Sequence, residues 1–375
     1  MPDWINKVLD NDVAGRLTAF AHAAEMRGDL HPRQLELLHE HRWFRMFIPK
    51  SFGGIGLTLP EVVRLEEALA WADGSTAWVA TLCGGAGWFI GFVETAIVKE
   101  FFTGDRVCIA GSGSATGTAE VVAGGYRISG SWPFASGALH ATAFTANCKV
   151  HENGHPKLGA DGREIVLPFI FKPDEVEVKR TWGATGMIAT ASHSFSISDI
   201  TVPVERCFEI SPATAKLSDP VYQYPFLQLA EATLAANISG MTVRFLELIA
   251  DNTSYPKNSR TCNELSSAHQ STVNKLRVFF SASVDQTWKQ LIDSGKVEEV
   301  ALRQVSQYSY ELVRACRVSI DVLYALCSLD SGSREGELNR VWRNIDTALS
   351  HALFRKRLVA EMPSLSLATS PTPRA

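Results

Sequence analysis

The chain has 375 residues, of which 46% are hydrophobic and 20% charged, and its net charge at pH 7 is −4. This composition predicts a globular protein with two or three domains and a large core. The charge balance provides no basic surface for nucleic acid, and no segment reaches the roughly 18 apolar residues needed to cross a membrane.

The N-terminus begins Met-Pro-Asp-Trp, without the basic and apolar regions of a signal peptide. The seven cysteines are scattered and form no Cys-x-x-Cys pair. This pattern favours free thiols in the reducing cytoplasm over a disulfide framework or a metal site.

Residues 3–103 are predicted to be helical. The Gly-rich stretch 50–57 is a loop, and it lacks the preceding strand and the Lys-Ser/Thr that a phosphate-binding loop requires. A helix is expected to begin at Thr58, with Pro60 in its first turn and Glu61 near its positive end. The apolar segment 75–102 contains several glycines, which indicate either close packing or room beside a ligand.

Residues 107–210 show short alternating runs typical of strands. Gly124 and Gly125 predict a tight hairpin turn, and the clearest strands are expected at 167–171, 176–182 and 194–202. The sequence Ala135-Ser136-Gly137 places a small hydroxyl at a strand end, where either a structural turn or a contact to a flat ligand is possible. The region is predicted to form a small barrel or sandwich.

A linker at 211–220 precedes four long amphipathic segments, 225–252, 265–294, 297–329 and 338–359, which predict a four-helix bundle. In the last of them Arg340, Asn344, Thr347 and His351 share one helical face. Such a face is either solvated or functional. Arg343 pairs either with an anionic ligand or with a carboxylate in a salt bridge.

Four stretches, taken together, resemble motifs of the acyl-CoA dehydrogenase superfamily. They are residues 48–54, 124–137, 182–203 and 340–351. The resemblance implies a mainly α fold with a central β domain, divided into an N-terminal helical domain (1–105), a β domain (106–212), a four-helix bundle (213–361) and a tail (362–375).

Two details, Pro133–Gly137 and His351, are similar to the oxygenase components of two-component flavin monooxygenases. That branch implies reduced FMN or FAD from a separate reductase, O₂ as co-substrate and a C4a-hydroperoxyflavin that hydroxylates or N-oxygenates a small organic molecule. It also implies a homotetramer. The cysteine pattern, charge and hydropathy described above predict that the protein is cytoplasmic and binds neither nucleic acid nor membrane.

By this resemblance, Ser136 lies beside the flavin N5, and His351 donates or accepts a proton near the reacting oxygen. The remaining expected cofactor contacts are Trp132, Phe134, Ala135, Gly137, Ser112, Ser114, Thr116, Thr118 and Arg343. The expected substrate pocket is lined by Cys83, Gly84, Gly87 and Trp88, a segment without the His that phenol-hydroxylating relatives often carry there.

Two alternatives remain open at this point. One is an FAD-dependent acyl-CoA dehydrogenase in which Glu335 takes the α-proton of the substrate. The other is a binding protein that kept the fold without catalysis. A dehydrogenase would purify yellow, whereas an oxygenase component would purify nearly colourless and need added reduced flavin.

Overall fold

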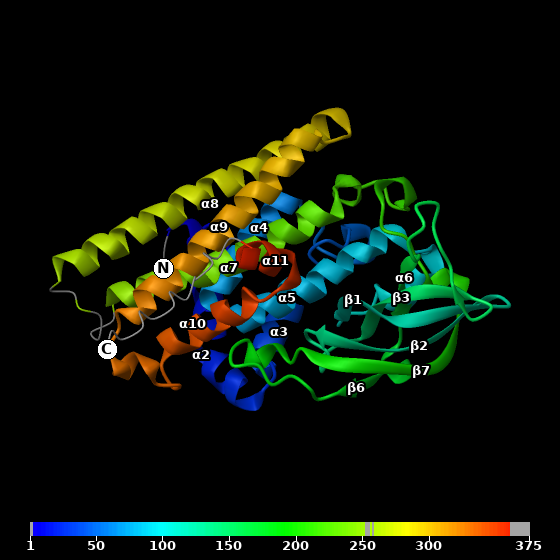
Figure 1. The fold of residues 1–375 in the computed structure, drawn as a ribbon, viewed down its shortest axis with the longest axis horizontal. Coiled ribbons are helices and arrows are strands. Elements are labelled where there is room, and N and C mark those ends of the chain that lie inside the picture. The colour runs from blue at the N-terminus through cyan, green and yellow to red at the C-terminus, as the bar shows by residue number, and fades with distance from the viewer. Residues whose placement is uncertain (1–2, 252–255, 257–258, 361–375) are drawn as a thin grey trace, which may run out of the picture.

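The computed structural model describes residues 3–251, 256 and 259–360. The predicted tail at 362–375 and the predicted helix end at Asn252 lie outside these residues. The chain passes from helices to strands and back to helices, as expected (Figure 1). The N-terminal helices are α1 (Asp3–Asn6), α2 (Asn11–Arg27), α3 (Pro32–Glu40), α4 (Leu59–Ala72), α5 (Gly74–Gly87) and α6 (Thr95–Phe101).

The start of α4 follows the predicted capping pattern. Thr58 Oγ1 accepts from the Glu61 amide at 3.4 Å, and the Glu61 carboxylate accepts from the Thr58 amide at 2.8 Å. Asp73 ends α4 and caps α5, because its carboxylate accepts from the Thr76 amide at 2.9 Å. The chain therefore passes directly from α4 into α5.

The middle region forms one mixed sheet in the order β4-β3-β1-β2-β7-β6, with β5 also paired to β3. The expected central β domain is present, and its strands pair in this one branched sheet. Its strands are β1 (Ile109–Val122), β2 (Gly125–Ala135), β3 (Ala143–Glu152), β4 (His155–Pro156), β5 (Val166–Phe171), β6 (Glu177–Lys179) and β7 (His193–Pro203). The predicted hairpin is confirmed, because Val122 pairs with Gly125 and Gly124 has φ of 78°.

The C-terminal helices are α7 (Phe226–Asp251), α8 (Arg260–Ser294), α9 (Glu299–Ala325), α10 (Glu337–Ala348) and α11 (Ala352–Ala360). The prediction of one helix over 338–359 is wrong, because the chain breaks after α10. His351 lies at this break, and its Nδ1 accepts from the Leu353 amide at 3.4 Å, as an N-cap side chain does.

Two apolar cores stabilise the fold. One is continuous from Ile5 to Phe354 and joins the N-terminal and C-terminal helices, whereas the other lies on the sheet. The division into domains at 105 and 212 therefore stays a prediction, although the helix-to-strand transitions fall near those positions. Figure 1 shows the sheet at one end of the molecule, with α5 running between it and the C-terminal helices. Within the described ranges, no helix is long and apolar enough to span a membrane.

Candidate active site

The end of β2 departs from regular strand geometry. Its pairing with β7 shifts between Trp132 and Ala135, and Phe134 has φ of 65°. A non-glycine residue in this left-handed region is uncommon and costs free energy. The Phe134 side chain is 65% exposed, and its ring stands edge-on to Trp182 at 6.2 Å between ring centroids. A large apolar ring is thus held at the surface.

Trp132 takes the opposite side of the strand, and its assignment to the wall of the ligand site is wrong. It is completely buried, stacks on Phe195 at 5.2 Å and donates from Nε1 to the Asn147 carbonyl at 2.8 Å. The local irregularity at Phe134 explains the error, because strict alternation would have placed both rings on one face.

Ser136 follows directly and is 3% exposed. Its hydroxyl lies 2.7 Å from the Ser192 hydroxyl, which lies 2.7 Å from the hydroxyl of Thr190. The Gly137 amide donates to the Thr190 carbonyl at 2.9 Å. The strand end is therefore bound to the segment before β7. Sequence reasoning missed Thr190 and Ser192, although the run Thr-Ala-Ser-His-Ser at 190–194 is rich in hydroxyl groups.

His193 contributes a buried polar atom in the same place. It pairs with Ala135 across the β2–β7 ladder and is 6% exposed. Nδ1 accepts from the Trp182 amide at 3.0 Å, so the neutral ring carries its hydrogen on Nε2, and this buried Nε2 has no hydrogen-bond partner in the structure. Burial lowers the pKa of His193, which keeps the imidazole neutral at pH 7.

His351 lies against α5, because its ring meets the Trp78 ring edge-on at 5.9 Å. Burial lowers the pKa of His351, so the ring is neutral at pH 7. Since Nδ1 accepts from the Leu353 amide, Nε2 carries the hydrogen and is the donor atom of this side chain.

Helix α5 contacts both Ser136 and His351. The Cys83 thiol donates to the Ser136 carbonyl at 3.4 Å, whereas Trp78 of the same helix contacts His351. Leu82 and Ala86 follow Trp78 at i+4 and i+8, so they lie between Trp78 and Cys83 around the helix. The α5 surface between Ser136 and His351 is therefore uncharged and apolar.

The expected pocket residues Gly84, Gly87 and Trp88 lie on the other side of α5, which corrects that prediction. A Cβ at Gly84 would approach the Trp43 carbonyl oxygen to 2.9 Å, and one at Gly87 would approach the Phe44 carbonyl oxygen to 3.2 Å. Trp88 is buried and donates to the Val221 carbonyl at 2.9 Å. These glycines permit close packing, and only Cys83 of the four faces the site.

The loop before the 188–190 turn is fixed to α10. The Asn344 side-chain oxygen accepts from the Met187 amide at 2.7 Å, and Thr347 Oγ1 accepts from the Gly186 amide at 3.1 Å. Arg343 donates to Asn339, to the Thr185 carbonyl and to Glu25, each within 2.7 Å. All three guanidinium nitrogens have intrachain partners. Arg343 therefore has a structural role, and its predicted contact with the cofactor is not retained.

The serines and threonines of β1 lie where its pairing with β3 is interrupted, between Ser112 and Gly117. Thr116 and Thr118 donate to the carbonyls of Ser131 and Ser129, at 2.6 and 3.3 Å. Ser112 and Ser114 are partly exposed in the interrupted segment. Ser112 and Ser114 are thus the more available pair for a ligand.

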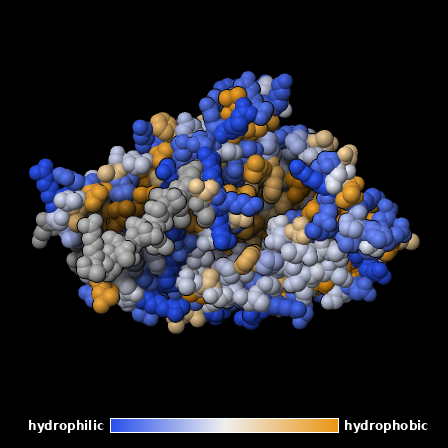
Figure 2. Space-filling view, in the orientation of Figure 1, coloured by the Kyte–Doolittle hydropathy of each residue, from blue (hydrophilic) through white to orange (hydrophobic). Residues whose placement is uncertain are grey.

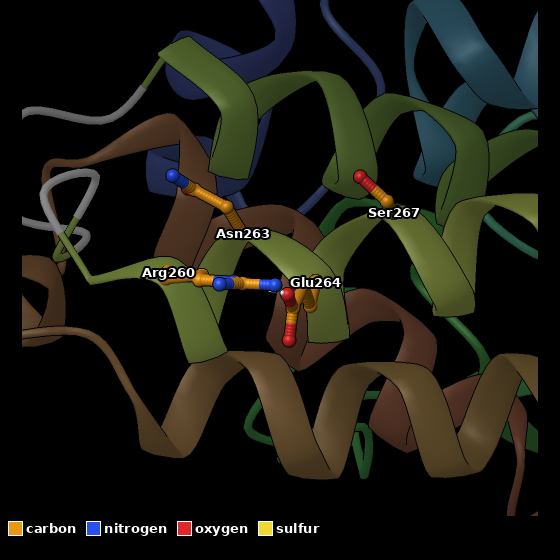
Figure 3. Close-up of a pocket in the computed structure, with 4 residues that line it drawn as sticks. All are labelled: Arg260, Asn263, Glu264 and Ser267. Carbon is orange, nitrogen blue, oxygen red and sulfur yellow. Dashed lines mark hydrogen bonds and ion pairs between the residues drawn. The ribbon is translucent and has the colours of Figure 1, made fainter.

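Figure 2 shows a hollow in the middle of this face, with hydrophobic surface inside it, where Figure 1 places α5 and α11 next to the sheet. A second hollow, of about 590 Å³, lies at the start of α8, at the end of the molecule away from the sheet. Its lining residues Arg260, Asn263, Glu264 and Ser267 all come from that helix, and Arg260 pairs with Glu264 (Figure 3). This second hollow contains none of the predicted site residues. Among the described residues no cluster of His, Cys, Asp or Glu could hold a metal ion.

The sequence and the fold are both similar to those of known proteins. No protein-family model matches the chain. The chain is 26% identical over 352 residues to the oxygenase subunit HsaA of a flavin-dependent monooxygenase from Mycobacterium tuberculosis, covering 88% of this chain and 87% of that protein. It is 24% identical to indole-3-acetate monooxygenase from Acinetobacter baumannii, over 90% of this chain and 88% of that one. The solved structure of XiaF from a Streptomyces species, in complex with FADH₂ and glycerol, superposes with a TM-score of 0.83 at 19% identity, over 96% of this chain and 94% of XiaF.

The chain is therefore similar over most of its length to flavin-dependent monooxygenases, and its fold is that of acyl-CoA dehydrogenase-like flavin monooxygenases. These relatives are enzymes, which argues against the alternative of a non-catalytic binding protein. The dehydrogenase alternative loses its base. Glu335, the base in that alternative, lies in the loop before α10. Its side chain is 73% exposed, and its carboxylate lies 3.1 Å from Nε2 of His22 on α2.

Proposed function

We propose that the protein is the oxygenase component of a two-component flavin monooxygenase, which uses reduced FMN or FAD and O₂ to hydroxylate or N-oxygenate a small organic substrate. The observation that carries the proposal is the pairing of two sites on α5. Ser136 lies at one, where its carbonyl accepts from the Cys83 thiol, two residues after the exposed ring of Phe134, and a neutral His351 lies at the other, against Trp78.

The residues at the end of β2 fit a flavin. The exposed Phe134 ring and the Trp182 ring offer apolar faces for a flat ring system. Polar groups lie beside them, namely the Ser136 hydroxyl, the unpartnered His193 Nε2 and the partly exposed Ser112 and Ser114. A flavin needs this combination, because its ring is apolar at one end and carries hydrogen-bonding atoms at the other.

A bound reduced flavin supplies the electrons and the carbon that reacts with O₂. The chain's own part is to hold the ring on Phe134, to hydrogen-bond its polar edge through Ser136, and to exclude water with the apolar face of α5. His351, with its hydrogen on Nε2, donates a hydrogen bond on the opposite side, where oxygen and substrate meet.

The substrate in this proposal is a small apolar or aromatic molecule. Trp78, Leu82 and Ala86 present no charge, so this part of the site suits an apolar or aromatic ring. The names of the relatives support this choice, since they include an indole-3-acetate monooxygenase and a resorcinol hydroxylase.

The partners in this proposal are a separate flavin reductase and three further copies of the chain. The terms oxygenase subunit and oxygenase component in the relatives' names support the reductase. Val278 and Phe279 on α8 support an assembly through the helical bundle, since they are 66% and 41% exposed in the single chain. Seven free cysteines, four of them buried, support the cytoplasm.

The test supplies reduced FMN or FAD anaerobically, adds O₂ with indole-3-acetate or resorcinol, and measures oxygenated product and H₂O₂. We expect Ser136→Ala and His351→Ala to fold normally and to lower the product-to-H₂O₂ ratio about tenfold or more, because each removes a polar group near the reacting atoms. His155→Ala, which changes an exposed histidine on β4, is the control and should not change this ratio. Unchanged ratios in both site variants contradict the site, and anaerobic bleaching of a purified yellow protein by an acyl-CoA contradicts the reaction.

A further inference from the structure

Three hydroxyl groups form a chain that ends on a carbonyl. Thr190 Oγ1 donates to the Met187 carbonyl at 2.7 Å, because a carbonyl oxygen can only accept. The Thr190 and Ser192 hydroxyls are 2.7 Å apart, and so are the Ser192 and Ser136 hydroxyls. All three residues are at most 4% exposed, so water does not compete freely for these groups.

The carbonyl fixes the direction of the whole chain. Each hydroxyl has one hydrogen, and that of Thr190 is used on Met187. Ser192 must therefore donate to Thr190, and Ser136 must donate to Ser192. The Ser136 oxygen is left with acceptor lone pairs only, and it has no hydrogen to offer a ligand.

We infer that Thr190 and Ser192 are positioning residues that make Ser136 an obligate hydrogen-bond acceptor, and that this gives the site its preference for reduced over oxidised flavin. The inference rests on the proposed function, in which Ser136 faces the flavin N5. In reduced flavin N5 carries a hydrogen and can donate to Ser136, whereas in oxidised flavin N5 has only a lone pair. Two acceptors facing each other repel, so the oxidised ring is bound less tightly.

The expected size follows from one hydrogen bond. The hydrogen bond that the reduced ring gains, together with the repulsion between two acceptors in the oxidised complex, corresponds to roughly a tenfold preference or more. The preference should disappear when N5 is replaced by carbon, because the reduced 5-deaza ring has no N–H at that position.

Thr190 allows a sharp test because its hydroxyl can be removed without leaving Met187 unsatisfied. The Met187 carbonyl also accepts from Trp182 Nε1 at 2.9 Å and from the Thr190 amide at 3.1 Å. In Thr190→Val the Ser192 hydrogen loses its acceptor and turns to Ser136. Ser136 is then free to donate its own hydrogen to a ligand, although Ser136 itself has not been changed.

The experiment measures dissociation constants for FMN, reduced FMN and reduced 5-deaza-FMN by anaerobic titration, with FAD as a second series. In the unchanged protein we expect reduced FMN to bind about tenfold or more tightly than FMN or the reduced 5-deaza analogue. In Thr190→Val and Ser192→Ala we expect FMN to bind more tightly than in the unchanged protein, and the preference to fall about tenfold. A purely structural role would instead weaken all three ligands equally.

Two variants serve as controls. Thr190→Ser keeps the hydroxyl and should keep the preference, whereas Thr181→Ala breaks a similar 2.7 Å hydroxyl pair with Ser194 at the surface and should change nothing. An unchanged preference in Thr190→Val overturns the inference while leaving the proposed function intact. Failure of both reduced FMN and reduced FAD to bind overturns the proposed function and the inference with it.

Discussion

Two neighbouring residues of α5, Gly84 and Gly85, differ in whether the surrounding structure requires glycine. Gly84 is needed for packing, since a Cβ there would lie 2.6 Å from Met46 Cε and 2.9 Å from the Trp43 carbonyl oxygen. Gly85 has no such constraint, because a Cβ there would meet nothing within 4 Å. It lies three residues after Leu82 and seven after Trp78, on the side that faces the site.

We expect Gly85→Ala to raise the free energy of unfolding by about 0.5–1 kcal/mol, because alanine is the better helix former. Gly84→Ala should lower it by about 1–3 kcal/mol, because the backbone at Trp43 must move to admit the methyl group. Urea unfolding of the two variants, followed by circular dichroism, measures both changes. Equal effects from the two substitutions would contradict this account of the helix.

At the scale of elements, α4, α5 and α7 enclose polar side chains in their common core. Glu66 is completely buried, and its two carboxylate oxygens have no hydrogen-bond partner. The Thr81 hydroxyl of α5 accepts from the side-chain Nδ2 of Asn237 on α7 at 3.3 Å, and Thr81 also interacts with Glu66. Burial raises the pKa of Glu66 well above its ordinary value of 4.5, so the folded protein keeps this carboxyl protonated.

The raised pKa predicts a pH-dependent stability. Below about pH 4.5 both the folded and the unfolded chain hold this proton; as the pH rises, the unfolded chain releases it first, so Glu66 destabilises the fold progressively up to its folded pKa. Glu66→Gln cannot ionise. We expect the stability of this variant relative to the unchanged protein to increase between pH 4.5 and pH 8.

Urea midpoints at the two pH values provide the measurement. Glu335→Gln changes an exposed carboxylate and is the control, with no expected pH trend. A constant difference between Glu66→Gln and the unchanged protein from pH 4.5 to pH 8 would show that Glu66 is ionised in the fold.

At the scale of the whole molecule, the two ends of the described chain are tied together. Glu25 on α2 and Arg343 on α10 are 318 residues apart, and their charged atoms lie 2.7 Å apart with side chains 7% and 10% exposed. The helices at the two ends also share one apolar core. The sheet is therefore an insertion between two halves of one helical body.

We expect Arg343→Met to lower the free energy of unfolding by about 3 kcal/mol, because it leaves the buried Glu25 carboxylate with only the exposed Arg334, at 3.9 Å, and frees the loop at Thr185. Arg163→Met removes an exposed ion pair with Asp161 and should cost less than about 0.5 kcal/mol. Denaturant unfolding distinguishes the two. A loss for Arg343→Met as small as that for Arg163→Met would show that the buried pair contributes no stability.

Local sequence rules determined much of this protein. The α4 cap at Thr58, the hairpin at Gly124 and the order of helices, strands and helices follow from residues close together in the chain. The motifs at 124–137 and 340–351 also led to the resemblance to flavin monooxygenases and to the prediction of Ser136 and His351 as site residues, because such motifs are short and contiguous.

Only the tertiary structure decided which groups those residues meet. The shift in strand pairing buries Trp132 and exposes Phe134. The ion pair with Glu25 gives Arg343 a structural role. The segment at 187–192 supplies the hydroxyls and the carbonyl that orient Ser136. The physical reason is that propensities and periodicities act over a few residues, whereas hydrogen-bond partners and burial are set by packing between segments that the sequence keeps far apart.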